Sequence, residues 1–109
     1  MEDKNLYTIC IYTENQIGLL AQFSNMFTRR NLNIMSLNAQ ASSIPGVHFL
    51  LIVAEGTGQK VHQLVHSLEK RVDVIKVFEY EGDKTGTDQL NLLLDTLEEV
   101  RNYLKIRTR

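Results

Sequence analysis

Residues 6–30 read LYTICIYTENQIGLLAQFSNMFTRR, and within them a strand pattern gives way to a helix pattern. Residues 6–12 are rich in β-branched and aromatic side chains, which is typical of a strand. Residues 13–18 carry the chemistry of a turn. Apolar side chains then recur at helical spacing, and two arginines follow where a helix C-terminus favours cations. We therefore predict a strand, a loop and a helix, with the apolar face of the helix formed by Leu19, Leu20, Phe23, Met26 and Phe27.

Two further strand patterns follow this unit. Residues 34–41 alternate apolar and polar side chains, which predicts a strand with one polar face. Residues 42–46 place Pro and Gly in a turn between strands. Residues 47–54 are apolar on both faces except for His48, so we expect a central strand there.

A second helix and a fourth strand complete the domain. An amphipathic helix is predicted from the spacing of Val61, Leu64, Val65, Leu68 and Val72, and residues 73–80 form another strand pattern. The order strand, helix, strand, strand, helix, strand predicts the α+β class and a ferredoxin-like βαββαβ arrangement, an antiparallel four-stranded sheet with both helices on one face. Because two strands are apolar on both faces, we expect the open sheet face to need a partner and the chain to dimerise.

The remaining residues predict a separate helical segment. Residues 81–87 form a polar linker that contains glycine. Residues 88–105 then carry an apolar stripe of helical period, and a helix of this length is unstable alone in water and must dock. We therefore divide the chain into a domain of residues 1–80, a linker of residues 81–87 and a C-terminal amphipathic helix of residues 88–105, with the stripe formed by Leu90, Leu93, Leu94, Leu97, Val100 and Leu104.

Composition excludes several classes of protein. The 109 residues include 12 Lys and Arg against 13 Asp and Glu, a net charge of −1, which leaves no electrostatic footprint for nucleic acid or an anionic membrane. The longest apolar run, residues 49–54, is far shorter than the ~20 residues that span a bilayer. A single cysteine forms no internal disulfide, and the charged first residues do not resemble a signal peptide. We expect a cytoplasmic protein.

Candidate catalytic and metal-ligating residues favour structural roles. His62 and His66 have the i, i+4 spacing of a two-histidine metal face, but Gln63 stands where the HExxH motif needs Glu, so we interpret them as a solvated helix flank. Cys10 has no cation beside it, which favours a buried structural thiol. We interpret His48 as a residue of the sheet surface. Nucleophile-elbow and phosphate-loop motifs are absent from the sequence, so we expect a non-catalytic protein without a metal site.

The loop between the first strand and the first helix favours ligand binding. Backbone N–H groups at a helix start suit an anion such as a carboxylate. Gly18 allows close approach of a ligand and Asn15 offers an amide. An apolar wall is provided by Ile17, Leu19 and Leu20. A small aliphatic amino acid matches these needs.

Four runs of sequence resemble one known family. YTENQIGLL at residues 12–20, NIMSL at 33–37, GVH at 46–48 and RVDVIKV at 71–77 resemble an ACT domain, of the subtype found in the regulatory small subunit of acetolactate synthase (acetohydroxyacid synthase). The resemblance covers about residues 6–80. It implies a βαββαβ domain that pairs side by side with a second copy and binds a branched-chain amino acid, valine in the family, between the two. The ligand-binding residues that it implies are Asn15, Gln16, Ile17, Gly18, Leu19 and Leu20 of one protomer with Asn33 and Ile34 of the other.

The resemblance also implies a partner. Feedback regulation would act on a large catalytic subunit of acetolactate synthase, which would carry thiamine diphosphate, FAD and magnesium, while this chain would bind none of them. The chain departs from the family at Met35, where an acidic residue is usual, and at residues 38–40. These positions bear on which of valine, leucine and isoleucine would bind.

Two other functions remain open. The first is a free-standing ACT-domain sensor of amino acids with another partner or ligand. The second is an RRM-like RNA-binding module, because the RRM has the same order of elements. That module needs aromatic side chains on its first and third strands and a basic start to the third, whereas residues 47–54 contain one aromatic, Phe49, and no basic start.

Overall fold

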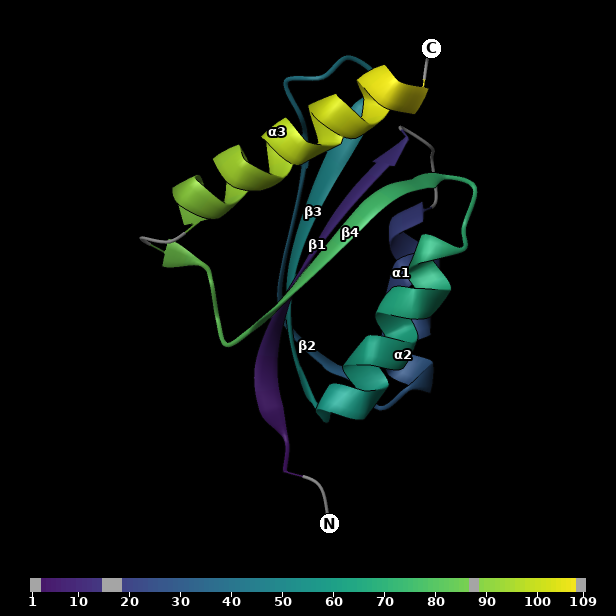
Figure 1. The fold of residues 1–109 in the computed structure, drawn as a ribbon. Helices are drawn as coiled ribbons and strands as arrows, with labels where there is room; N and C mark the ends of the chain where they lie inside the picture. The colour runs from purple at the N-terminus through teal and green to yellow at the C-terminus, as the bar shows by residue number, and fades with distance from the viewer. Residues whose placement is uncertain (1–2, 15–18, 87–88, 108–109) are drawn as a thin grey trace.

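A single antiparallel sheet of four strands organises the chain, as the computed structural model shows for residues 3–14, 19–86 and 89–107. The strand order is β2-β3-β1-β4, which confirms the ferredoxin-like βαββαβ arrangement with an added C-terminal helix. Figure 1 shows α1 and α2 on one side of the sheet and α3 on the other. The elements are β1 (Asn5–Glu14), α1 (Leu19–Arg29), β2 (Asn33–Ala41), β3 (Val47–Gly56), α2 (Gly58–Glu69), β4 (Val74–Glu81) and α3 (Gln89–Arg107).

The two central strands carry the most apolar sequence. β1 pairs with β3 along its whole length, from Asn5 opposite Gly56 to Glu14 opposite Val47. β1 also pairs with β4 on its other edge, and its side chains are buried on both faces of the sheet, by α1 and α2 on one face and by α3 on the other. β2 lies at an edge and pairs only with β3 among the described strands, and most of its side chains are exposed. The burial pattern therefore follows strand position.

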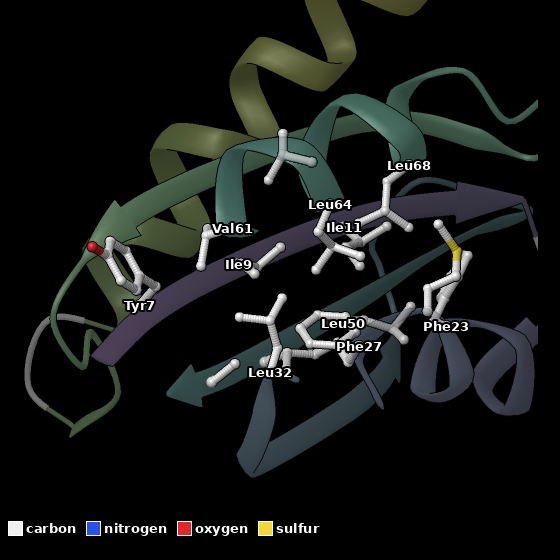
Figure 2. Packing of buried hydrophobic residues seen from close by; sticks show 14 of the residues in the cluster. Tyr7, Ile9, Ile11, Phe23, Phe27, Leu32, Leu50, Val61, Leu64 and Leu68 are labelled. Carbon is white, nitrogen blue, oxygen red and sulfur yellow. The ribbon is translucent and has the colours of Figure 1, made fainter. Parts of the chain in front are cut away.

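The first core lies between the sheet and the two helices α1 and α2. Ile9 and Ile11 project from β1 toward this side, with Leu50 beside them on β3. Phe23 and Phe27 of α1 are fully buried against these strands, and α2 adds a row of aliphatic side chains at helical spacing (Figure 2). The row consists of Val61, Leu64, Val65 and Leu68. Burial of this apolar surface is the main force that holds the two helices on the sheet.

A second core lies on the opposite face of the sheet, beneath α3. Tyr12 and Phe49 lie here with their ring centroids 5.0 Å apart, and α3 contributes buried Leu92 and Val100. The Tyr12 hydroxyl is 2.9 Å from Oγ1 of Thr96 in a buried hydrogen bond. The prediction that the last helix docks is confirmed. The expectation that this face needs a partner to cover it is wrong, because α3 covers it from within the chain.

The end of α2 differs from the sequence prediction at Val72. α2 begins at Gly58, where the Thr57 side chain accepts a hydrogen bond from the backbone N–H of Lys60. It ends at Glu69, so Val72 lies beyond the helix with 91% of its surface exposed. Val72 has the spacing of the apolar helix face but is not part of the helix, so its assignment to that face was wrong. α1 ends at Arg29, and Asn31 just beyond it has a positive φ of 55°, which asparagine tolerates well.

Candidate functional site

One half of the predicted site lies where β1 ends and α1 begins. A pocket of about 100 Å³ opens here between Glu14 and the first turn of α1. Leu19 is 6% exposed and belongs to the core, whereas Leu20 is 42% exposed at the mouth of the pocket. Asn15, Gln16, Ile17 and Gly18 connect the two elements and lie outside the described residues. The pocket is lined by Thr13, Glu14, Leu19, Leu20, Ala39, His48 and Leu50.

His48 belongs to this pocket, which the sequence interpretation missed. It lies on β3 opposite Thr13, on the same face of the sheet as Leu50. Its Nδ1 atom is buried and has no hydrogen-bond partner among the described residues. The sequence did contain a hint of this position. Side chains two residues apart on a strand point to the same face, so His48 shares the face of Leu50, which is turned toward α1. A buried ring nitrogen offers a polar contact in an otherwise mostly apolar pocket.

The other half of the predicted site lies at the start of β2. Asn33 is exposed there, and Ile34 is half-buried against the first core. Both line a cavity of about 560 Å³ that also receives the side chains of Lys4 and Lys60. Its lining residues include no acidic side chain, so the cavity favours an anionic group. The lining consists of Lys4, Thr28, Asn31, Leu32, Asn33, Ile34, Gly56, Thr57 and Lys60.

A β-bulge shapes this half of the site. The pairing of β2 with β3 steps from Ile34 opposite Ala54 to Ser36 opposite Val53, so Met35 is the extra residue. The Asn33 amide donates a hydrogen bond to the Met35 sulfur at 3.4 Å. Met35 itself is 56% exposed. A bulge re-aims neighbouring side chains, and here it orients the Asn33 amide beside the cavity.

The two halves do not meet within one chain. The first pocket contacts β2 at Ala39, and the second contacts it at Asn33 and Ile34. Five residues of extended chain separate Ala39 from Ile34, a distance of roughly 17 Å at the usual rise per residue. The structure therefore brings Leu20 together with His48, and Asn33 together with Ile34, at opposite ends of an edge strand.

Comparison with known proteins settles the family. Residues 9–76 match the model of the AHAS small subunit-like ACT domain. The chain belongs to this family. The matched segment of the ACT domain runs from β1 into β4 and contains the residues of both pockets except Lys4, whereas α3 lies outside it.

Individual relatives agree with this assignment. The chain is 32% identical over 88 residues to a probable acetolactate synthase small subunit of Methanothermobacter thermautotrophicus, and the match covers 81% of this chain and 52% of the relative. It is 31% identical over 87 residues to the acetolactate synthase small subunit of Mycolicibacterium smegmatis, with 80% and 51% covered. The small subunit from Thermotoga maritima superposes with a TM-score of 0.61 at 28% identity, over 68% of this chain and 46% of that one. The chain thus spans about half the length of these relatives.

The titratable groups of the described residues favour structural roles over catalytic ones. Burial raises the pKa of the Cys10 thiol to about 12, so the thiol is protonated at neutral pH and is not a nucleophile. His62 is exposed on α2 and its Nδ1 lies 2.7 Å from Glu79, as a surface pair. Among the described residues no group of three or more His, Cys, Asp or Glu is placed to hold a metal ion. Within the same residues no helix is long and apolar enough to cross a membrane.

Proposed function

We propose that this ACT-domain protein is a non-catalytic regulatory subunit of acetolactate synthase that binds a branched-chain amino acid between two copies of itself. Membership of the small-subunit family and the similarity to acetolactate synthase small subunits support the link to this enzyme. The observation that carries the shared site is the division of the predicted ligand residues between two pockets at opposite ends of β2.

Antiparallel pairing of two β2 strands would join these pockets. β2 is an edge strand of the sheet, and the outer side of an edge strand presents backbone donors and acceptors to which a further strand can pair. A two-fold axis near Leu37, midway along β2, would set the start of one strand beside the end of the other. Asn33 and Ile34 of one protomer would then face the Leu20 and His48 pocket of its partner, and each dimer would hold two such sites.

The chemistry of the combined site fits an aliphatic amino acid. Lys4 and Lys60 supply positive charge for a carboxylate, and Asn33 supplies an amide that both donates and accepts hydrogen bonds. Leu20 and Ile34 supply apolar surface for a branched side chain, and Glu14 supplies a carboxylate for the ammonium group. The site would therefore recognise the charged ends of the ligand and its aliphatic side chain at once.

The catalytic chemistry would belong to a separate large subunit. That partner would carry thiamine diphosphate, FAD and magnesium in the cytoplasm, and this chain would act on it by changing assembly or shape when the amino acid binds. A free-standing sensor remains the second hypothesis. An activity assay distinguishes the regulatory subunit from the free-standing sensor. A sensor with another partner would bind the amino acid without changing the activity of the acetolactate synthase catalytic subunit.

Calorimetry and an activity assay test the proposal together. We expect the chain to bind valine, leucine or isoleucine, and Asn33→Ala to weaken binding by ~1–3 kcal/mol through loss of polar contacts. Asn91→Ala on the exposed surface of α3 is the matched control and should bind as the wild type does. The activity of the catalytic subunit should respond to the amino acid only when this chain is present. Absence of binding for all three amino acids, or equal binding by Asn33→Ala, would overturn the site.

The RNA-binding hypothesis is disfavoured by the sheet itself. An RRM stacks bases on aromatic side chains that its first and third strands expose. Here the corresponding side chains are Tyr12 and Phe49, which are 0% and 1% exposed beneath α3. Bases have no access to them in this structure.

A further inference from the structure

A basic groove lies between α1 and the end of α2 and shares only Thr28 with the cavity at the start of β2. It has a volume of about 690 Å³, and three of the residues that line it are arginines. Both helices lie on the same side of the sheet (Figure 1). The lining consists of Gln22, Asn25, Met26, Thr28, Arg29, Arg30, Ser67 and Arg71.

Hydrogen bonds hold two of the three guanidinium groups in place. Arg30 donates to the Met26 carbonyl oxygen at 3.2 Å and to the Ser67 hydroxyl at 2.9 Å. Arg71 donates to both carboxylate oxygens of Asp73, at 3.0 and 2.8 Å, and to the Gln22 side-chain oxygen at 2.6 Å. These contacts fix the side chains before any partner arrives, which lowers the entropy cost of binding.

Charge is concentrated in this groove. Its lining carries three positive side chains and no negative one, although the whole chain has a net charge of −1. Asp73 neutralises Arg71 in part from outside the lining. Arg29 is exposed and makes no ion pair with the described residues. Arginine at a helix C-terminus is favoured by the helix dipole, which explains the Arg30 contact to Met26. Arg71 lies beyond α2, where Asp73 and the Phe23 ring, whose centroid is 5.4 Å from the guanidinium carbon, hold it in the groove.

We propose that this groove docks an acidic segment of a partner protein. Guanidinium groups bind carboxylates through paired hydrogen bonds, and the amides of Gln22 and Asn25 and the Thr28 hydroxyl match the backbone of an extended chain. The groove lies beside the C-terminal end of α1, where the Arg30 side chain already satisfies the Met26 carbonyl oxygen and offsets the negative end of the helix dipole. The inference rests on the proposed function in one respect, because the catalytic subunit would be the partner that supplies the segment.

Charge reversal in the groove tests the proposal directly. The probe is a fluorescent peptide of ten glutamates, compared with a glutamine peptide of the same length. We expect the wild type to bind the glutamate peptide alone, with an affinity that falls as salt is added. Arg29→Glu should weaken binding about tenfold. Arg101→Glu, an equal charge change on exposed α3, should leave binding intact. Equal loss in the two variants, or equal binding of both peptides, would overturn the groove.

A second measurement separates this inference from the proposed function. The wild type, Arg29→Glu and the double variant Arg29→Glu with Arg30→Gln are titrated with the catalytic subunit, and circular dichroism confirms that each variant is folded. Progressive loss of affinity supports the groove. Unchanged affinity in both variants overturns the groove and leaves the regulatory function standing. Binding of the glutamate peptide without any binding of the catalytic subunit supports the groove and overturns the proposed partner.

Discussion

The buried hydrogen bond between Tyr12 and Thr96 gives a sharp test of how α3 is held on the sheet. The Thr96 hydroxyl donates to the Leu92 carbonyl oxygen at 2.8 Å, so the Tyr12 hydroxyl is the donor in the 2.9 Å contact. Tyr12→Phe therefore removes one hydrogen bond and leaves Thr96 satisfied, at a cost of about 0.5–1.5 kcal/mol in the free energy of unfolding. Thr96→Val keeps the shape of the side chain and about the same helix propensity, but it leaves the buried Tyr12 hydroxyl without a hydrogen-bond partner. This should lower the free energy of unfolding by about 1–3 kcal/mol.

The double variant adds the decisive comparison. The double variant of Tyr12→Phe and Thr96→Val has no unpaired hydroxyl at this place. It should therefore be more stable than Thr96→Val alone. Urea unfolding, followed by circular dichroism at one fixed protein concentration because the chain is expected to dimerise, measures all four proteins. Additive losses, or a Thr96→Val variant as stable as the wild type, would refute the reasoning that this bond is buried between β1 and α3.

Two further predictions follow from the shifted pKa values. Because burial raises the pKa of Cys10 to about 12, iodoacetamide should alkylate it only after unfolding, and mass spectrometry of rapid labelling in the native state would contradict this. The hydrogen bonds from Arg71 hold the pKa of Asp73 below its usual range. The pair therefore stabilises the folded protein at any pH above the pKa that Asp73 has in the unfolded chain. This stabilisation is lost as the pH falls through the lower pKa that Asp73 has in the folded protein. Arg71→Gln should thus lower the melting temperature at neutral pH, and the difference from wild type should shrink in acid; a difference independent of pH would argue against the pair.

The sequence predicted the fold well because each element has a strong local signal. The alternation in residues 34–41 predicted a strand with one polar face, and the double-sided apolar run in residues 47–54 predicted a central strand; the structure has strands at both places, β2 at an edge and β3 in the interior of the sheet. Val72 shows the limit of this reasoning, since an apolar period carries no information about where a helix ends. The cover of the second sheet face by α3 was not predicted, because the docking partner of an amphipathic helix depends on the path of the linker.

The candidate site was predicted only in part. Leu20, Asn33 and Ile34 line pockets, while Leu19 both lines the first pocket and belongs to the core, because it occupies the inward side of the first turn of α1. His48 was missed as a pocket residue, since its neighbours come from β1 and α1, far away in the sequence. The resemblance assigned Asn33 and Ile34 to a second protomer, and their place in a separate pocket from Leu20 is consistent with that prediction.

The most direct test of the central claim is binding of valine to a mixture of two damaged chains. Leu20→Asp should destroy the site half that one protomer supplies, and Asn33→Ala should weaken the half that the other supplies. Each variant alone should bind poorly, whereas a mixture that has exchanged subunits should regain wild-type affinity in about a quarter of its sites, because half of the dimers are mixed and each has one intact site. Calorimetry of the mixture measures this fraction. A mixture that binds no better than its two components would show that the amino acid is not held between two copies of the chain.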